Sequence, residues 1–184
     1  MILCFVTFGG NMSRIISWID VDLSISQCVA LASKTVLVLF GFGVSVAFVL
    51  ALFQLQTRDT WISDFMRNED IVVVIISFII AVPIEEFGFR LFPVLIYRSC
   101  SGSLSARNRN IGLILLMLAS SLIFGWWHGG IPTVFTLGPI GFVFAVVFMR
   151  CGGCRGSLFR GFAFSCLVHL IYNLSLLLLI RTVE

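Results

Sequence analysis

Two adjacent carboxylates in an apolar stretch are the first residues of this sequence that could do chemistry. Glu85 and Glu86 follow a long run of apolar residues and precede Arg90. A charge at the centre of a membrane helix costs about 2.5–3.5 kcal/mol, so three unpaired charges would cost about 8–10 kcal/mol. We therefore expect these side chains to face protein or water, to have partners and to serve a function.

Helical geometry predicts different surroundings for the two glutamates. Glu86 and Arg90 are four residues apart with the acid first, which is the favourable order for an ion pair. Glu85 points about 100° away around the helix and has no cation on its own helix. The spacing thus predicts a structural Glu86–Arg90 pair and a free carboxylate at Glu85. Pro83 lacks an N–H group and is expected to kink this helix.

The two histidines of the chain also lie in apolar stretches. His128 ends an F-G-W-W-H motif that begins at Phe124, and His169 begins an H-L-I-Y-N motif that ends at Asn173. The four-residue spacing puts His169 and Asn173 on one helix face. Both histidines thus lie at membrane-helix positions, like the unpaired Glu85, and a functional role is expected for them. The alternatives are structural histidines and an asparagine that only joins helices.

Composition indicates that lipid is the solvent of this chain. Of its 184 residues 59% are hydrophobic and 11% are charged, and the mean hydropathy is +1.10. Soluble domains have about 45–50% apolar and about 25% charged residues. The net charge is only +3, and the sequence has no run of Lys/Arg of the kind that binding to nucleic-acid phosphates needs, which argues against a nucleic-acid partner.

Five apolar stretches approach the length of about 20 residues that a membrane span needs. They are residues 35–55, 71–97, 111–128, 133–149 and 158–180. Residues 13–31 are less apolar and are interpreted as an interfacial helix. The sequence therefore predicts an all-α, polytopic transmembrane helix bundle with about five membrane-spanning helices and an N-terminal interfacial segment. Residues 1–34 would form a tail with the interfacial helix, and residues 35–184 would form a membrane-embedded core.

Basic residues predict the orientation of the bundle. With a cytoplasmic N-terminus, eight Lys/Arg fall in cytoplasmic segments and three in outer segments. Counting about 1.5 Å per residue from the cytoplasmic helix ends puts Glu85 at about 18 Å, His169 at about 16 Å and His128 at about 26 Å. These depths disagree, so helix tilt, the Pro83 kink and side-chain reach must close the gap, or a boundary is misplaced.

The motifs resemble those of one family. The CPBP group, which comprises type II CAAX prenyl endopeptidases and the related bacterial Abi proteins, has the pattern E-E-x-x-x-R, F-x-x-x-H and H-x-x-x-N on separate membrane helices. This chain has E-E-F-G-F-R from Glu85 to Arg90, followed by the two histidine motifs, in the same order and without a departure. The resemblance covers about residues 71–180.

The resemblance implies an intramembrane endopeptidase of the glutamate type, with residues 35–184 as the peptidase core. Glu85 with His128 would activate a water, while His169 and Asn173 would donate hydrogen bonds to the oxyanion. Three further residues, Glu86, Arg90 and Phe124, would orient the site. No cofactor is expected. The substrate would be a membrane protein or a lipidated, CAAX-type peptide, and the chain would reside in a bacterial cytoplasmic membrane.

Three alternatives stay open at this stage. Zinc could bind Glu85, His128 and His169, although no H-E-x-x-H motif is present. The chain could be a non-catalytic immunity or regulatory partner on the same scaffold. A proton-coupled transporter would need an inverted repeat, which the sequence lacks. The C-x-x-C motif of Cys151 and Cys154 has no second pair at zinc-ribbon spacing, so ordinary loop cysteines are the favoured interpretation.

Overall fold

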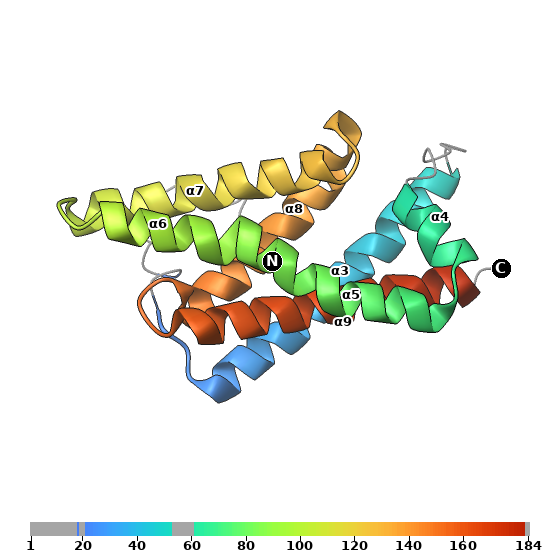
Figure 1. Cartoon of the computed structure of the whole chain (residues 1–184), viewed down its shortest axis with the longest axis horizontal. Helices are drawn as coiled ribbons and strands as arrows, with labels where there is room; N and C mark the ends of the chain where they lie inside the picture. Colours follow the sequence, from blue (N-terminus) through green and yellow to red (C-terminus); the bar gives the residue numbers. More distant parts are fainter. Residues whose placement is uncertain (1–17, 19–20, 53–60, 183–184) are drawn as a thin grey trace.

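The computed structural model describes residues 18, 21–52 and 61–182, and these residues form helices without any β-strand (Figure 1). The helices are α3 (Ile25–Leu52), α4 (Trp61–Asn68), α5 (Ile71–Glu86), α6 (Phe92–Cys100), α7 (Ala106–Trp127), α8 (Ile131–Phe148) and α9 (Leu158–Thr182). Two π-helical segments, Phe87–Leu91 and Met149–Gly153, continue α5 into α6 and extend α8.

Five of these helices are long and apolar enough to cross a membrane, which confirms the predicted fold class. They are Ile25–Ser45, Ile71–Cys100, Ala106–Trp127, Ile131–Gly153 and Leu158–Thr182. The predicted boundary at residue 34 falls inside α3, because the helix already begins at Ile25. Of the interfacial segment predicted at 13–31, residues 13–17, 19 and 20 lie outside the described residues, and residues 25–31 form the first turns of α3.

The chain between the spans predicted at 35–55 and 71–97 contains the short helix α4. Arg181 near the end of α9 holds α4 in place. Its guanidinium donates hydrogen bonds to the backbone oxygens of Met66 and Glu69. Met66 is buried, and it packs with Val74 and Phe78 of α5 in one apolar cluster. The helix α4 thus covers one end of the α5–α9 pair (Figure 1).

The helix that carries the two glutamates changes its winding beside them. Pro83 lies within α5, and the π-helical turn Phe87–Leu91 follows directly after Glu86. Such π turns recur at functional sites because they rotate the side chains that follow them. Ser120 of α7 donates a hydrogen bond to the backbone oxygen of Phe89 within this turn.

The helices α7 and α8 form a hairpin inclined to α5 and α9 (Figure 1). Gly130 makes the tight turn possible, since its φ of 78° lies in the left-handed region that favours glycine. Gly125 allows close approach of the two backbones, because a Cβ there would lie 2.8 Å from the nitrogen of Gly138. His128 is the C-cap residue of α7, so this hairpin decides its position.

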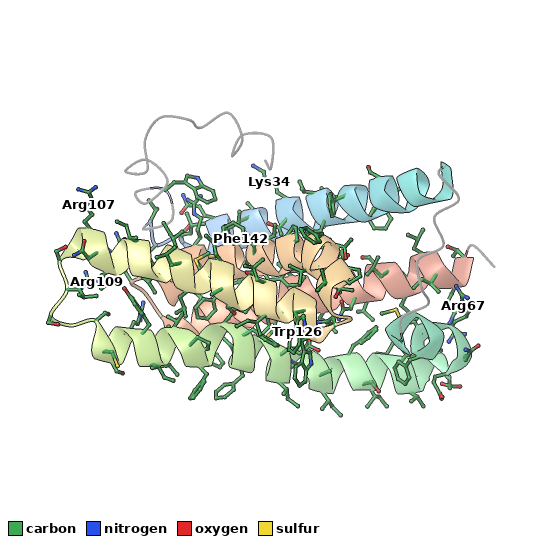
Figure 2. The ribbon with its side chains drawn as sticks, turned by 90° about the horizontal axis from the view of Figure 1, so that it is seen from above. Lys34, Arg67, Arg107, Arg109, Trp126 and Phe142 are labelled. Atoms are coloured by element: carbon green, nitrogen blue, oxygen red, sulfur yellow. The ribbon has the colours of Figure 1, made fainter. Side chains whose placement is uncertain are left out.

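The basic loops lie together at one end of the long axis. Figure 2 shows Arg107 and Arg109 at this end and Arg67 at the other. The backbone nitrogen of Leu23 donates to the oxygen of Arg150, and Arg160 forms an ion pair with Asp22. The N-terminal end of α3 is therefore joined to the α8–α9 connection.

The cysteines of the C-x-x-C motif form no disulfide among the described residues, and the same holds for Cys28, Cys100 and Cys166. The two glycines between them have a conformational reason. Gly152 has a φ of 133°, and a Cβ on Gly153 would lie 2.3 Å from the ring of Phe148. The motif therefore forms a close turn beside the aromatic ring.

Candidate active site

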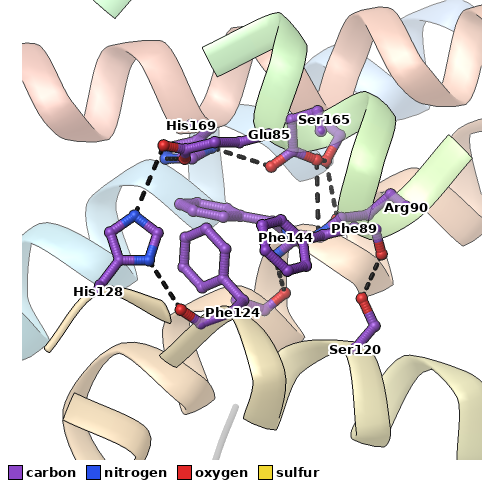
Figure 3. A network of polar contacts seen from close by, with 11 residues as sticks. Glu85, Phe89, Arg90, Ser120, Phe124, His128, Phe144, Ser165 and His169 are labelled. Atoms are coloured by element: carbon purple, nitrogen blue, oxygen red, sulfur yellow. Dashed lines mark hydrogen bonds and ion pairs between the residues drawn. The ribbon is translucent and has the colours of Figure 1, made fainter. Parts of the chain in front are cut away.

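Glu86 is completely buried and has partners on two helices. Its carboxylate accepts a hydrogen bond from the hydroxyl of Ser165 and contacts Nδ1 of His169 at 2.9 Å. The ion pair predicted from the spacing is present, with Nε of Arg90 3.6 Å from the carboxylate. Figure 3 shows how these contacts converge from α5, the π turn and α9. The buried charge is thus compensated by a cation and by hydrogen bonds.

Arg90 is held from several sides. Nη2 donates to the backbone oxygen of Gly141 at 2.9 Å, and Cζ lies 4.5 Å from the ring centroid of Phe124. A desolvated cation over an aromatic face gains about 2 kcal/mol. A Cβ on Gly141 would approach Nη2 to 3.0 Å, so the glycine leaves room for the guanidinium.

Glu85 lies next to both imidazoles. Its side chain is 24% exposed, against 0% for Glu86. Oε1 lies 3.6 Å from Nε2 of His128, and Oε2 lies 3.7 Å from Nε2 of His169. These separations are longer than a direct hydrogen bond. Polar groups at such distances commonly share a water molecule.

The other nitrogen of each imidazole is bound to the protein. Nδ1 of His128 lies 2.7 Å from the backbone oxygen of Phe124, which can only accept, so this nitrogen carries a proton. Nδ1 of His169 lies against the carboxylate of Glu86 and donates to it in the same way. Both Nε2 atoms are therefore directed toward Glu85.

Aromatic rings fix the planes of the two imidazoles. Phe144 stacks on His169 with ring centroids 4.4 Å apart and an interplanar angle of 23°. Phe124 lies 4.3 Å from His128 and 5.7 Å from His169, centroid to centroid. Phe124 thus contacts Arg90 and both imidazoles, which accounts for a phenylalanine four residues before His128.

A cavity of about 370 Å³ opens on this cluster. Its polar residues are Ser77, Glu85, His128, His169, Tyr172 and Asn173, and its apolar residues include Met66, Phe78, Trp127, Leu137 and Leu176. It extends from the glutamate to α4. The volume exceeds that of several water molecules, since one occupies about 30 Å³ in the liquid.

The structure brings all four residues singled out for chemistry to one place. Glu85, His128, His169 and Asn173 line the same cavity, and Glu86, Arg90 and Phe124 support them from behind. His128 lies 3.6 Å from Glu85, so the helices bring these two side chains together despite the different depths obtained by counting residues.

Two supporting residues were missed by the sequence analysis. Ser165 precedes His169 by four residues, so helical spacing could have identified it as a partner on the same face. Phe144 gives no such local signal, since it comes from α8 and meets His169 only through packing.

The donor set was also compared with the zinc alternative. Within residues 18, 21–52 and 61–182, no group of three or more His, Cys, Asp or Glu side chains is arranged to hold a metal ion. In the ligand set of the zinc alternative, Glu85 lies 3.6 Å from Nε2 of His128 and 3.7 Å from Nε2 of His169.

Fold and site together define a class of protein. It is an integral, multi-pass membrane protein with a carboxylate and two imidazoles at a cavity among its spans. A family model described as type II CAAX prenyl endopeptidase Rce1-like matches residues 67–175, which is more than half of the chain. The chain belongs to this family and is in general terms an intramembrane CAAX-type endopeptidase.

The matched segment contains all three sequence motifs. No match to the chain was found among curated proteins, and none was found among solved structures.

Proposed function

We propose that this protein hydrolyses a peptide bond with a water activated by Glu85, without a metal ion. The supporting observation is that both oxygens of the Glu85 carboxylate face an imidazole Nε2 at 3.6–3.7 Å, on the wall of a cavity. This arrangement positions a water beside a proton acceptor, which is the first requirement of general base catalysis.

The reaction then proceeds in two steps. The oxygen of the water bonds to the peptide carbonyl carbon while one of its protons passes to Glu85, and a tetrahedral oxyanion forms. Glu85 next returns the proton to the amide nitrogen as the carbon–nitrogen bond breaks, which yields an amine and a carboxylic acid that then releases its remaining proton to water. His128, held through Nδ1 by the oxygen of Phe124, orients the water.

The oxyanion is stabilised by donors from α9. Asn173 lines the cavity one helical turn after His169. Glu86 fixes the ring of His169 through Nδ1, so that Nε2 is directed into the cavity on the same helix as Asn173. One preorganised donor of this kind contributes about 10²–10³ in rate.

The substrate in this proposal is a membrane protein or a lipidated, CAAX-type peptide. The cavity supports it, because apolar side chains such as Phe78, Leu137 and Leu176 continue from the polar end toward α4. A bacterial cytoplasmic membrane is the proposed location, and the five apolar helices are compatible with it.

The decisive experiment replaces Glu85 by glutamine in the purified protein. Glu85→Gln keeps the size of the side chain and removes the proton acceptor, so cleavage of a CAAX-type peptide should fall by about 10²–10⁴-fold. Because Glu85 is partly exposed and is not the buried partner of Arg90, the melting temperature should remain near that of the parent.

The matched control is Ser77→Ala. Ser77 lines the same cavity but takes no part in the reaction as proposed, so this variant should retain cleavage. Full activity in Glu85→Gln would overturn the assignment of the base. A non-catalytic regulatory protein would show no cleavage by the parent and an unchanged cellular phenotype in Glu85→Gln.

Metal dependence is measured separately. The proposal predicts that metal analysis finds less than one equivalent of zinc and that a chelator leaves the cleavage rate unchanged. Loss of cleavage on chelation, with recovery on adding zinc, would instead assign Glu85, His128 and His169 as ligands.

A further inference from the structure

The basic end of the molecule has an excess of positive charge. No Asp or Glu occurs between Glu86 and Glu184, a stretch that contains eight arginines. Six of them lie in the two loops of the basic end and beside them: Arg98, Arg107, Arg109, Arg150, Arg155 and Arg160. Among the described residues of this end, the carboxylate of Asp22 is already paired with Arg160. Arg98 and Arg109 form no ion pair with a carboxylate of the described residues.

Two of these arginines lie close enough to repel each other. Arg98 is in the last turn of α6 and Arg109 is in the first turns of α7. The charge of Arg109 acts unfavourably on Arg98, which is half-buried. The hydroxyl of Tyr97 donates to the backbone oxygen of Arg109 at 3.0 Å and fixes the two helix ends together. The helix ends that carry Arg98 and Arg109 are thus held next to each other.

Two buried hydrogen-bond donors at the end of α6 lack acceptors. Nη2 of Arg98 is buried and has no hydrogen-bond partner, and neither has the hydroxyl of Ser101. Ser101 is only 2% exposed. It follows Arg98 by three residues, which places it on the same side of the helix end. A buried donor without an acceptor costs about 1–3 kcal/mol, and more when it is charged.

We propose that Arg98, Arg109 and Ser101 bind a phosphate group at the basic end of the bundle. A phosphate would separate the two guanidinium charges and accept from the unpaired donors, and arginine is well suited to this geometry. The site lies where the apolar helix Ile71–Cys100 ends, which is the level of lipid headgroups. The phosphate belongs to an anionic lipid or to a soluble phosphate.

The test compares charge-matched variants in nanodiscs. Melting temperatures are measured in phosphatidylcholine alone, with added phosphatidic acid, and with inorganic phosphate in the buffer. The parent should melt at a higher temperature with phosphatidic acid. Arg98→Gln and Arg109→Gln should lose this shift, with affinity about tenfold or more weaker.

Arg107→Gln is the control, since it removes the same charge from the same segment. Figure 2 shows Arg107 projecting away from the bundle, and this variant should keep the shift. In phosphatidylcholine alone, Arg98→Gln should be at least as stable as the parent, because a repulsion and a buried unpaired donor are removed. Ser101→Ala should weaken binding without altering the net charge.

Each outcome decides the proposal. A shift with phosphatidic acid alone assigns the site to a lipid, and an equal shift with inorganic phosphate assigns it to a soluble phosphate. An equal loss in Arg107→Gln would overturn the site in favour of diffuse charge, and the absence of any shift in the parent would also overturn it. Peptide cleavage is not part of the readout, so the result is independent of the proposed reaction.

Discussion

Glu86 connects the helices of the site through three different side chains. Arg90 supplies the opposite charge, while Ser165 and His169 of α9 supply hydrogen bonds. Removing one partner of a buried ion pair costs about 3–5 kcal/mol, because the other charge remains buried. Glu86 is therefore a positioning residue whose loss affects stability, whereas Glu85 faces the cavity.

At the residue scale, Ser165→Ala tests this division. The variant removes one hydrogen bond to a charged group, which contributes about 1.5–3 kcal/mol. We expect a lower melting temperature and a lower kcat with little change in KM, because His169 is held by the same carboxylate. Melting curves and steady-state cleavage rates measure both effects.

Ser175→Ala is the matched control on the same helix. Its hydroxyl donates only to the backbone oxygen of Ile171, four residues before it. This substitution should leave both the melting temperature and kcat near the parent values. Equal effects of the two serine substitutions would show that the Ser165–Glu86 bond has no special part in the site.

At the scale of elements, the position of His128 depends on how closely α7 approaches α8. Gly125 lies three residues before His128, and its Cα faces the α8 backbone. Small residues allow such close approach between membrane helices. The distance between the two helices therefore decides whether His128 reaches Glu85.

Gly125→Ala is expected to disturb this hairpin. The new Cβ would lie 2.8 Å from Cα of Val134 and 2.9 Å from the backbone oxygen of Thr133, and neither atom can move alone. Overpacking of this kind costs about 1–3 kcal/mol. Both the melting temperature and the cleavage rate should fall, as measured on the purified protein.

Gly41→Ala makes the same change on α3, where a Cβ would meet nothing within 4 Å. The control should melt at or above the temperature of the parent, since alanine favours the helix. If Gly125→Ala behaved like Gly41→Ala, the contact between α7 and α8 would not determine the position of His128.

At the scale of the whole molecule, the basic loops predict that their end faces the cytoplasm. Cys100 at the end of α6 is exposed and lies at this end. A variant that retains only Cys100 should react with a membrane-impermeant maleimide in inside-out vesicles and stay unlabelled in intact cells. Asn68→Cys in a cysteine-free background, at the opposite end, should give the reverse pattern.

Labelling of both cysteines from the same side would contradict a membrane span at Ile71–Cys100, which separates the two positions. Labelling in the reversed sense would keep the fold but invert its orientation, and it would place the proposed phosphate site on the outer surface.

The sequence by itself determined the class of fold and which of the two glutamates forms the ion pair with Arg90. Apolar runs of about 20 residues can only become spanning helices in lipid, because each backbone group must be satisfied within its own segment. The four-residue spacing of Glu86 and Arg90 predicted their ion pair, which is present. Both results follow from local geometry within one helix, so the linear sequence contains them.

The tertiary structure decided how separate helices meet. The contact of Nδ1 of His169 with Glu86, the stacking of Phe144 on His169 and the position of α4 over the cavity all join elements distant in sequence. The approach of His128 to Glu85 also joins separate helices, and counting residues along each helix could not predict it. The rotation and tilt of each helix depend on contacts between side chains of different segments. The periodicity of a single segment therefore cannot predict them.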